Sequence, residues 1–595
     1  MIKKLKIILP IVIALSLLTA LVSGCAGQDS DSKQDSINET LKNVTAIELA
    51  RLMGYGINLG NTMEACDSRN RIPNRDPEVY ETMWGNPVTT QEMITGMKDA
   101  GFKTLRVPVA WTNAMDFESG DFTINAAYLN RVEEIINYAL NENMYVIVNN
   151  HWDHGWWSMF GHPEPAWREF AMQMFISMWT QIADRYEHFD HRVIFEPSNE
   201  EWGNRFNDRT PFSPTGGTLT EDECYKLLTG LSQVFVDLIR STGGNNENRF
   251  LLMKGYNTDV RMTTDERFKL PVDSADSRLL LSVHYYTPWS YCGDTSGIGT
   301  WGRTTEVEEM NELLGSLTKF TAMGFGVVLG EWGVLDNEGP DRLKFFTNFL
   351  DNSDLHGFVP ILWDTGYDPV HGRLFDRNDS LTIVAPDILA LFQSRSVYAR
   401  EGKSVDDIQA AARDSMANTL ELASQRVETV LTADEAVAWI MFVDGEWGLQ
   451  YSVGDVYRPE QIADGMIATD AEITGEGTYT VALDFTGTGA GFADGFEFSA
   501  VGIMNGEILF PGFIMDITEI IINGKPADDF AGIPYTTNDN PVTTRVNLYN
   551  HWVSDVPPEA RVLGGNISAA SPTFLENYRL TKIESISVTF NFIAP

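Results

Sequence analysis

Nine side chains able to do chemistry stand at or just beyond the ends of short apolar runs. They are Asn61, Arg106, His151, Asn199, Glu200, His284, Tyr286, Glu331 and Trp363. Buried Arg, His and Glu side chains cost stability unless they are paired, so such a set is hard to explain as core packing. Carboxyl and imidazole groups can move protons, and the set therefore predicts an active site.

The apolar runs predict the strands that would position these side chains. Eight of them lie between residues 50 and 400, at 54–60, 102–109, 145–149, 192–196, 249–254, 279–286, 326–331 and 358–363. Stretches with an apolar spacing of about 3.6 predict helices between the strands. These helices are expected at 90–100, 126–143, 169–188, 221–242, 306–323 and 341–350.

Eight strand-then-helix units predict an α/β fold, a closed parallel (β/α)8 TIM barrel. Each crossover must return the chain so that the next strand runs parallel to the last. The alternative is an open doubly wound sheet, which would place a glycine-rich phosphate loop after its first strand. The glycines of residues 54–60 have a different spacing, so we favour the barrel, whose functional face lies at the strand ends.

Composition narrows the classes of ligand. The 595 residues include 43 Lys and Arg against 83 Asp and Glu, a net charge of -40, which makes nucleic acid a poor partner. The chain also holds 15 Trp and 19 Tyr, side chains that fill cores or stack on flat uncharged ligands such as sugars. Cys66, Cys224 and Cys292 show no CxxC spacing, so we expect neither a disulfide nor a structural zinc site.

The N-terminus predicts a lipoprotein signal peptide over residues 1–25. Three lysines precede an apolar run at 7–22 that is shorter than the ~20 apolar residues of a spanning helix. The sequence LVSGC at 21–25 resembles the bacterial lipoprotein box, in which the cysteine is lipidated; a plain signal peptide is the alternative. Residues 26–43 predict a Ser/Asp-rich tether. We therefore expect an extracellular or cell-surface monomer that is anchored to a membrane through Cys25.

Sequence motifs accompany the predicted strand ends in order along residues 45–400. They are GINLGNT (56–62) with WGNPVTT (84–90), LRVPVAW (105–111), VNNH (148–151), VIFEPSNE (193–200), VHYYTP (283–288), VLGEWG (328–333) and LWD (362–364). Together they resemble glycoside hydrolase family 5, in particular its cellulase and xyloglucanase branch, subfamily 4. Two positions depart from the family pattern. Trp152 stands where a second His often follows His151, and Glu201 stands where a proline usually follows the Asn-Glu pair.

The resemblance implies a retaining endo-β-1,4-glucanase that hydrolyses β-glucan polysaccharides and needs no metal or cofactor. Retention needs two carboxyls about 5 Å apart, one to attack the anomeric carbon and one to protonate the leaving oxygen. Carried onto this chain, the motifs make Glu331 the nucleophile and Glu200 the acid/base. Arg106 and Tyr286 would hold Glu331 as a carboxylate. Cellulose, mixed-linkage glucan, xyloglucan and mannan all remain open as substrates.

The other residues of the set are expected to bind substrate. Asn199 would hydrogen-bond the sugar 2-OH, an interaction that strengthens in the transition state. His151 and His284 would fix the substrate and the carboxylates, Trp363 would give one sugar ring a flat apolar floor, and Asn61 would line the first strand end.

Several alternatives compete with this interpretation. Glu196 and Glu201 are neighbouring carboxylates, but Glu196 falls within a strand and Glu201 would point differently from Glu200. His151 and His154 could suggest a metal site, yet further ligands from later strands are missing. A different class of protein, a cell-surface glycan-binding lipoprotein without activity, is disfavoured because both carboxylates are present.

Six tryptophans fall in the predicted mouth loops. They are Trp152, Trp156, Trp157, Trp202, Trp289 and Trp301, and we expect about half of them to line a long aromatic cleft.

The domains are expected to follow in order. A catalytic barrel over 44–400 leads through a helical linker at 401–429 to a β-sandwich domain at 430–595. Alternating runs at 479–485, 496–501, 517–522, 544–548 and 583–592 predict its strands. Such a domain beside a polysaccharide hydrolase resembles a carbohydrate-binding module, and a structural cap is the alternative. The possible stacking residues are Trp447, Tyr451, Tyr535, Tyr549 and Trp552.

Overall fold

The computed structural model describes residues 43–595 with short internal exceptions. These are residues 68–70, 294–299, 336–340, 368–371, 398, 425–432, 446–448, 452–458, 460–462, 528–533, 538–541, 551–560, 563–574 and 576–577. Signal peptide, Cys25 and nearly all of the tether lie outside the described residues. The chain divides into two compact units. The described residues up to Tyr285 form one unit with 313–332 and 353–408, and the other takes in 286–312, 333–352 and 409–595.

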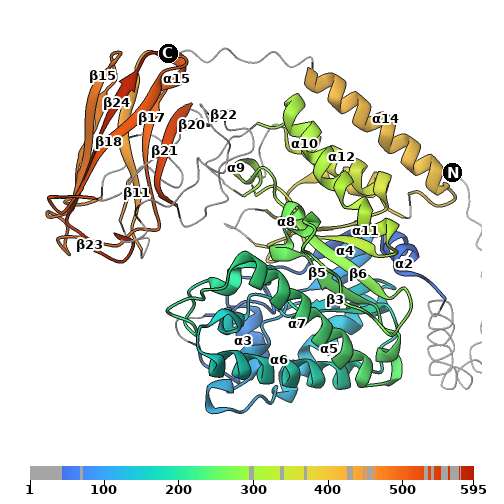
Figure 1. Cartoon of the computed structure of the whole chain (residues 1–595). Helices are drawn as coiled ribbons and strands as arrows, with labels where there is room; N and C mark the ends of the chain where they lie inside the picture. Colours follow the sequence, from blue (N-terminus) through green and yellow to red (C-terminus); the bar gives the residue numbers. More distant parts are fainter. Residues whose placement is uncertain are drawn as a thin grey trace, which may run out of the picture. The chain divides into compact units, whose positions relative to one another are not determined.

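The first unit contains a closed parallel barrel, as predicted (Figure 1). Its strands are β1 (Gly56–Asn58), β2 (Thr104–Val107), β3 (Tyr145–Asn149), β4 (Val193–Glu196), β5 (Leu251–Lys254), β6 (Leu279–Tyr285), β7 (Gly326–Trp332) and β8 (Val359–Leu362). Each strand pairs with the next, and β1 pairs with β8 to close the ring. Every residue of these strands is buried, as expected for a parallel sheet covered on both faces.

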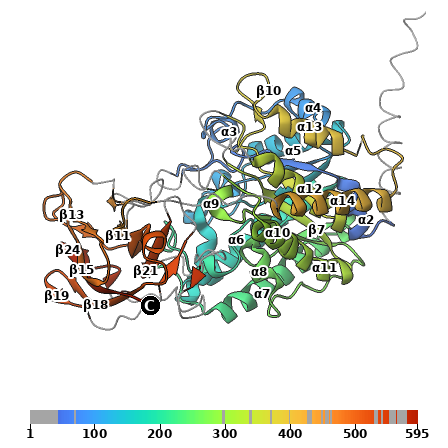
Figure 2. The same ribbon diagram turned by 90° about the horizontal axis from the view of Figure 1, so that it is seen from above.

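Helices follow the strands at close to the predicted positions. The main ones are α4 (Gln91–Asp99), α5 (Ala126–Asn141), α6 (Pro165–Tyr186), α7 (Glu221–Ser241), α8 (Val260–Thr264), α10 (Thr304–Ser316), α11 (Thr318–Ala322), α12 (Arg342–His356) and α13 (Pro386–Arg395). A capping box of Thr220 and Glu223 begins α7 because its side chains satisfy otherwise unpaired N–H groups. Figures 1 and 2 show α5, α6 and α7 along the outside of the barrel strands.

Shorter elements complete the first unit. They are α3 (Pro77–Glu81), the 3-10 turns η1 (Trp111–Ala114), η2 (Phe117–Ser119), η3 (Asp153–Gly161), η4 (Asn204–Asn207), η5 (Gly244–Glu247) and η6 (Tyr256–Thr258), and the hairpin of β9 (Phe375–Asp376) and β10 (Thr382–Ile383). Of these, η3 follows β3 and η4 follows β4, so both belong to loops that begin at the carboxyl ends of strands.

Helix α2 (Ala46–Met53) closes one end of the barrel. Its buried residues Ala46, Leu49, Ala50 and Met53 share an apolar cluster with residues from the first halves of several strands, such as Ile194. This plug occupies the end where the strands begin. The opposite end, where the strands finish, carries the polar residues singled out from the sequence.

The second unit contains the C-terminal antiparallel sheets. One sheet joins β11 (Val437–Val443), β12 (Gln450–Tyr451), β14 (Ala471–Glu472), β17 (Phe498–Met504), β20 (Tyr535–Thr536), β21 (Thr543–Asn550) and β22 (Arg561–Val562). Another joins β13 (Ile467–Thr469), β15 (Gly477–Asp484), β18 (Ile514–Ile522), β19 (Lys525–Pro526) and β24 (Ser585–Ile593), and β16 (Ala493–Asp494) pairs with β23 (Lys582–Ile583). Helices α9 (Trp289–Cys292), α14 (Val405–Ser424) and α15 (Gly506–Leu509) complete the elements.

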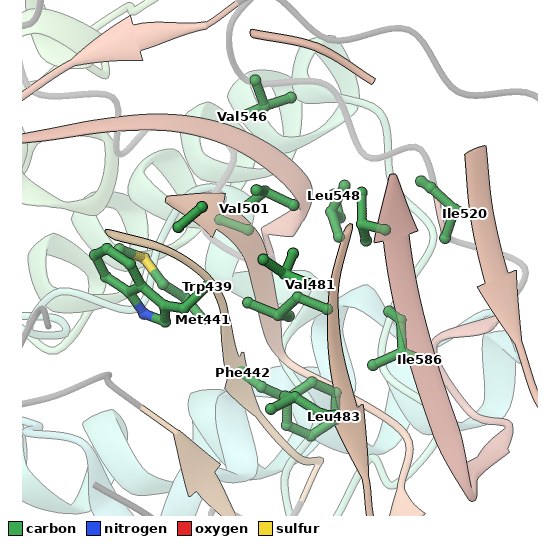
Figure 3. Close-up of a cluster of buried hydrophobic side chains, with 14 of the residues drawn as sticks. Trp439, Met441, Phe442, Val481, Leu483, Val501, Ile520, Val546, Leu548 and Ile586 are labelled. Atoms are coloured by element: carbon green, nitrogen blue, oxygen red, sulfur yellow. The ribbon is translucent and has the colours of Figure 1, made fainter. Parts of the chain in front are cut away.

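The two larger sheets share one apolar core. Trp439, Val501 and Val546 come from the first sheet, and Val481 and Ile586 come from the second (Figure 3). On β24 the residues alternate between buried and partly exposed, the pattern of a strand with one face in a core. The alternation read from the sequence located β15, β17, β18, β21 and β24, whereas β11 was not predicted.

Three of the proposed stacking residues are misplaced for that role. Tyr451, Tyr535 and Tyr549 are buried, with at most 2% of each residue exposed, so none offers a free ring face to a sugar. Alternation along a strand cannot by itself tell which face is covered, and the prediction was wrong for these tyrosines. Trp447 and Trp552 lie outside the described residues.

Two further observations concern the described chain as a whole. Cys66, Cys224 and Cys292 are buried and form no disulfide with one another. In the described part of the chain, helices with the length and apolarity needed to cross a membrane are absent.

Candidate active site

The barrel brings the two predicted catalytic carboxyls together at its mouth. Glu200 stands four residues beyond the end of β4, and Glu331 lies near the end of β7. One carboxylate oxygen of each lies within 4.8 Å of the other, and a nitrogen of His284 lies within the same distance of both. Glu200 is partly exposed, whereas Glu331 is almost buried. A separation this short matches direct attack by one carboxylate and is too small to admit a water molecule between carboxyl and sugar.

Arg106 organises the floor of the site. Its guanidinium is fully buried and donates to Glu196 Oε2 at 2.8 Å, to Glu331 Oε1 at 2.8 Å, to Asn199 Oδ1 at 2.8 Å and to Asn58 Oδ1 at 2.9 Å. Although burial opposes charge, Glu196 and Glu331 raise the pKa of Arg106 above its ordinary value. The arginine is therefore a fixed cation whose guanidinium aligns residues from three other strands, β1, β4 and β7.

Glu196 is a structural counterion, as its place within a strand predicted. Its carboxylate is fully buried between Arg106 Nε and Lys254 Nζ, at 2.8 and 2.9 Å. Burial alone would raise the pKa of Glu196, but Arg106 and Lys254 together lower it to about 2. Lys254, which also donates to Ser282 Oγ at 3.1 Å, was missed by the sequence analysis. A lysine at the end of an otherwise apolar strand was the available signal.

The carboxyl pair shares its charge unequally. Burial raises the pKa of Glu331 to about 8 and the neighbouring Glu200 adds to the rise, whereas Arg106 and Lys254 lower it. Two carboxyls so close resist double ionisation, so the pair holds one proton near neutral pH. The hydrogen bond from Arg106 favours negative charge on Glu331.

Two neutral histidines border the carboxyls. His284 Nδ1 lies 2.8 Å from Glu200 Oε1 and 3.6 Å from Glu331 Oε2. His151 stacks on Trp363 with ring centroids 5.7 Å apart and 14° between the planes, and its Nδ1 lies 4.0 Å from Glu331 Oε1. Burial lowers the pKa of both imidazoles well below the usual range. Each therefore acts as a neutral hydrogen-bonding group, and Trp363 remains partly exposed.

Asn61 and Tyr286 lie at strand ends, at the mouth of the barrel. The Asn61 backbone is left-handed, with φ of 59°; its N–H donates to Glu64 and its carbonyl accepts from Asn86 Nδ2 at 2.9 Å. Tyr286 follows β6 directly, belongs to the second unit, and meets Trp289 edge to face at 6.2 Å. Substrate contacts by these two side chains remain predictions.

The competing residues have other tasks. Glu201 is buried and accepts from Ser198 Oγ at 2.6 Å, Asn199 N–H at 2.7 Å and Trp152 N–H at 2.7 Å. The Glu201 side chain therefore points into the protein and differs in direction from Glu200, as expected from the sequence. His154 Nε2 lies 2.7 Å from Asn113 Oδ1 and takes no part in a metal cluster with His151 among the described residues.

Most of the mouth tryptophans are core residues. Trp156, Trp157, Trp202 and Trp301 have at most 2% of the residue exposed, so the expectation that about half of the six line a cleft was too generous. Only Trp152, partly exposed, and Trp289, 64% exposed, remain of those six. The loops bury these rings, since Trp156 packs against Phe160 of the same loop and Trp202 packs against Phe175 of α6.

A closed parallel barrel with two carboxyls this close at its strand ends is the arrangement of a retaining glycoside hydrolase. Comparison with known proteins agrees with this class. Residues 72–369 match the family model described as cellulase, glycosyl hydrolase family 5. The chain therefore belongs to glycosyl hydrolase family 5.

Relatives and solved structures place it among endoglucanases in particular. It is 34% identical to endoglucanase A of Paenibacillus barcinonensis over 58% of this chain and 88% of that protein. It is 30% identical to a xyloglucan-specific endo-β-1,4-glucanase of Bacteroides ovatus over 60% of this chain and 71% of the relative. A broad-specificity endoglucanase structure from Ruminococcus champanellensis with bound cellotriose, 30% identical, matches with a TM-score of 0.52 over 59% of this chain and 98% of that one.

Proposed function

We propose that the chain is a retaining endo-β-1,4-glucanase that hydrolyses β-glucan polysaccharides by double displacement. The observation that carries the proposal is the pair of Glu200 and Glu331, whose oxygens lie within 4.8 Å at the mouth of a family 5 barrel. Glu331 attacks the anomeric carbon as a carboxylate aligned by Arg106. Glu200 protonates the leaving oxygen and then takes a proton from the water that releases the glycosyl group.

The neighbouring groups supply binding and charge stabilisation. Asn199, held through its Oδ1 by Arg106, keeps its amide N–H groups for the sugar 2-OH. Trp363, stacked on His151, presents its other ring face to a sugar. Because every ionic group at the site is paired within the protein, a neutral polymer requires no counter-charge of its own.

The test is a hydrolysis screen with barley β-glucan, xyloglucan, carboxymethyl cellulose and mannan. We expect reducing ends and short oligosaccharides from at least one glucan, with the β-anomer as the first product in ¹H NMR. Glu331→Gln should abolish turnover and leave the circular dichroism spectrum unchanged. The α-anomer as first product would refute double displacement, and a wild-type chain inactive on every glucan would favour a non-catalytic glycan-binding protein.

Substrate preference is open within the same fold. The xyloglucan-specific relative and a lichenase from Caldicellulosiruptor among the similar structures support xyloglucan and mixed-linkage glucan as alternatives to cellulose. Mannan is a candidate substrate on the family resemblance alone. Relative kcat/KM values in the same screen rank the four substrates.

We further propose a surface location and a sandwich architecture. The predicted signal peptide and the LVSGC box support lipidation at Cys25, and with it a monomeric enzyme that is held at the cell surface by a membrane anchor. If so, Cys25→Ala should release the activity from the membranes of the source cells. Shared apolar burial between the two C-terminal sheets supports a β-sandwich over residues 430–595. If this domain binds glucan, Trp447 and Trp552 are the remaining stacking candidates, and their Ala variants should lower retention of the full chain on insoluble cellulose.

A further inference from the structure

A buried carboxylate stands directly behind the acid/base. Glu201 is 0% exposed and receives three hydrogen bonds, from Ser198 Oγ, Asn199 N–H and Trp152 N–H, at 2.6, 2.7 and 2.7 Å. All three partners are donors, so a carboxylate satisfies them with its two oxygens and has no need of a proton. Burial raises the pKa of Glu201, an effect that Ser198 and the Arg205 charge oppose.

These partners belong to two different mouth loops. Ser198 and Asn199 follow β4, whereas Trp152 follows β3, so the Glu201 side chain ties the loops together. The loop after β3 needs such a tie, because Trp152, Asp153 and His154 all have left-handed backbones, with φ of 43°, 51° and 62°. Left-handed backbones at bulky residues are unfavourable and persist only where surrounding contacts hold them.

The same tie fixes the residue between its anchor points. Glu200 lies between Asn199, whose N–H is bound, and Glu201, whose side chain does the binding. Beyond it, Arg205 Nη1 lies 3.5 Å from Glu200 Oε2 and the Arg205 guanidinium stacks over Trp152 at 5.1 Å. Trp152 therefore contacts both the side chain of Glu201, next to Glu200 in the chain, and Arg205, the cation beside the Glu200 carboxylate.

We propose that Glu201 is a positioning residue for the acid/base: it fixes Glu200 against Glu331 by clamping the loops after β3 and β4. The proposal rests on the proposed function. Family 5 enzymes usually have proline at this position, which has no side-chain oxygen and could not accept these hydrogen bonds. The clamp therefore depends on the glutamate that this chain has at position 201.

Glu201→Gln is the sharpest perturbation because it conserves shape. The amide has one acceptor oxygen and one NH2 group, so in either orientation its NH2 faces a backbone N–H, of Asn199 or of Trp152. The control is Glu81→Gln. Glu81 is equally buried, accepts from Thr89 N–H at 2.7 Å and Arg131 Nε at 2.9 Å, and bonds to no residue of the carboxyl site.

The readout compares substrates that do and do not need the acid. The leaving group in barley β-glucan is a sugar hydroxyl that must be protonated, whereas 2,4-dinitrophenyl β-cellobioside expels 2,4-dinitrophenolate, which needs no proton. Glu201→Gln should lower kcat/KM for glucan by roughly tenfold to a hundredfold, the cost of an ångström-scale misplacement, and change the value for the aryl cellobioside less than about threefold. Glu200→Gln should show the same contrast more strongly, and Glu81→Gln should show none.

Three outcomes would overturn the proposal: equal losses on both substrates, wild-type glucan activity in Glu201→Gln, or the same contrast in Glu81→Gln. If Glu201→Gln does not fold, Ser198→Ala removes one donor of the clamp and must show the contrast in weaker form; its absence would also overturn the proposal. Failure of the proposed function is a separate result, since the wild-type chain would then hydrolyse neither substrate.

Discussion

Replacing Glu196 by Gln should destabilise the barrel strongly, although the residue touches no substrate. Glu196 is the buried counterion between Arg106 and Lys254. Without its charge, the Glu200–Glu331 pair would be the nearest negative charge for both buried cations. The pKa of Glu196 falls from its ordinary value of 4.5 to about 2 on folding. At about 1.4 kcal/mol per pH unit, this drop corresponds to about 3 kcal/mol of the free energy of unfolding at pH 7.

The pH dependence gives this prediction its sign. Because folding lowers the pKa of Glu196, its contribution is complete above pH 4.5 and is lost as the pH falls through about 2. The difference in unfolding free energy between the wild type and Glu196→Gln should therefore shrink from about 3 kcal/mol at pH 7 to about 1.4 kcal/mol at pH 3.

Urea unfolding followed by tryptophan fluorescence at both pH values measures the difference. Glu134→Gln is the control, because Glu134 pairs with Arg131 at the surface with half of its side chain exposed, and its loss should cost less than about 0.5 kcal/mol. A loss below about 1 kcal/mol for Glu196→Gln at pH 7 would refute the reasoning. A loss of equal size at pH 7 and pH 3 would refute it as well.

Three further predictions concern activity. The pH profile of kcat/KM on glucan should be bell-shaped, because the Glu200–Glu331 pair must carry one proton. Its alkaline limb should fall near pH 8, since burial raises the pKa of Glu331 to about 8. A plateau that extends to pH 10 would contradict this prediction. Arg106→Met should lower kcat roughly a hundredfold in stopped assays, and an unchanged kcat would count against its role. Gly60→Ala places a new Cβ 2.7 Å from the Asp364 backbone oxygen and 3.0 Å from the Trp363 ring, so the segment that carries Trp363 must shift. KM for glucan should therefore rise by more than kcat changes, and wild-type kinetics would contradict a binding role for the Trp363 ring.

Strand positions were predictable because barrel strands are buried on both faces and read as continuous apolar runs. The run predicted at 145–149 coincides with β3, and the helix predicted at 221–242 ends one residue from the end of α7. Glu200 and Glu331 were predictable for a related reason. Strand ends of a parallel barrel converge on one face, and the motifs fixed which carboxyl on each strand to choose.

Other features depend on contacts that spacing does not encode. Trp156 and Trp202 looked like mouth residues, but their loops fold back and bury them against Phe160 and Phe175. Lys254 was missed because its only sequence signal is one charge at the end of an apolar run. The role of Glu201 required knowing that the loop after β3 brings Trp152 N–H within 2.7 Å of its carboxylate.

Double displacement requires that Glu331 form a covalent bond to the sugar. The most direct measurement is trapping with 2,4-dinitrophenyl 2-deoxy-2-fluoro-β-cellobioside, since fluorine slows both steps and the good leaving group lets the glycosyl-enzyme accumulate. We expect inactivation with one label per chain, located on Glu331 by peptide mass spectrometry and absent from Glu331→Gln. A label on Glu200, Glu196 or any other side chain would contradict it.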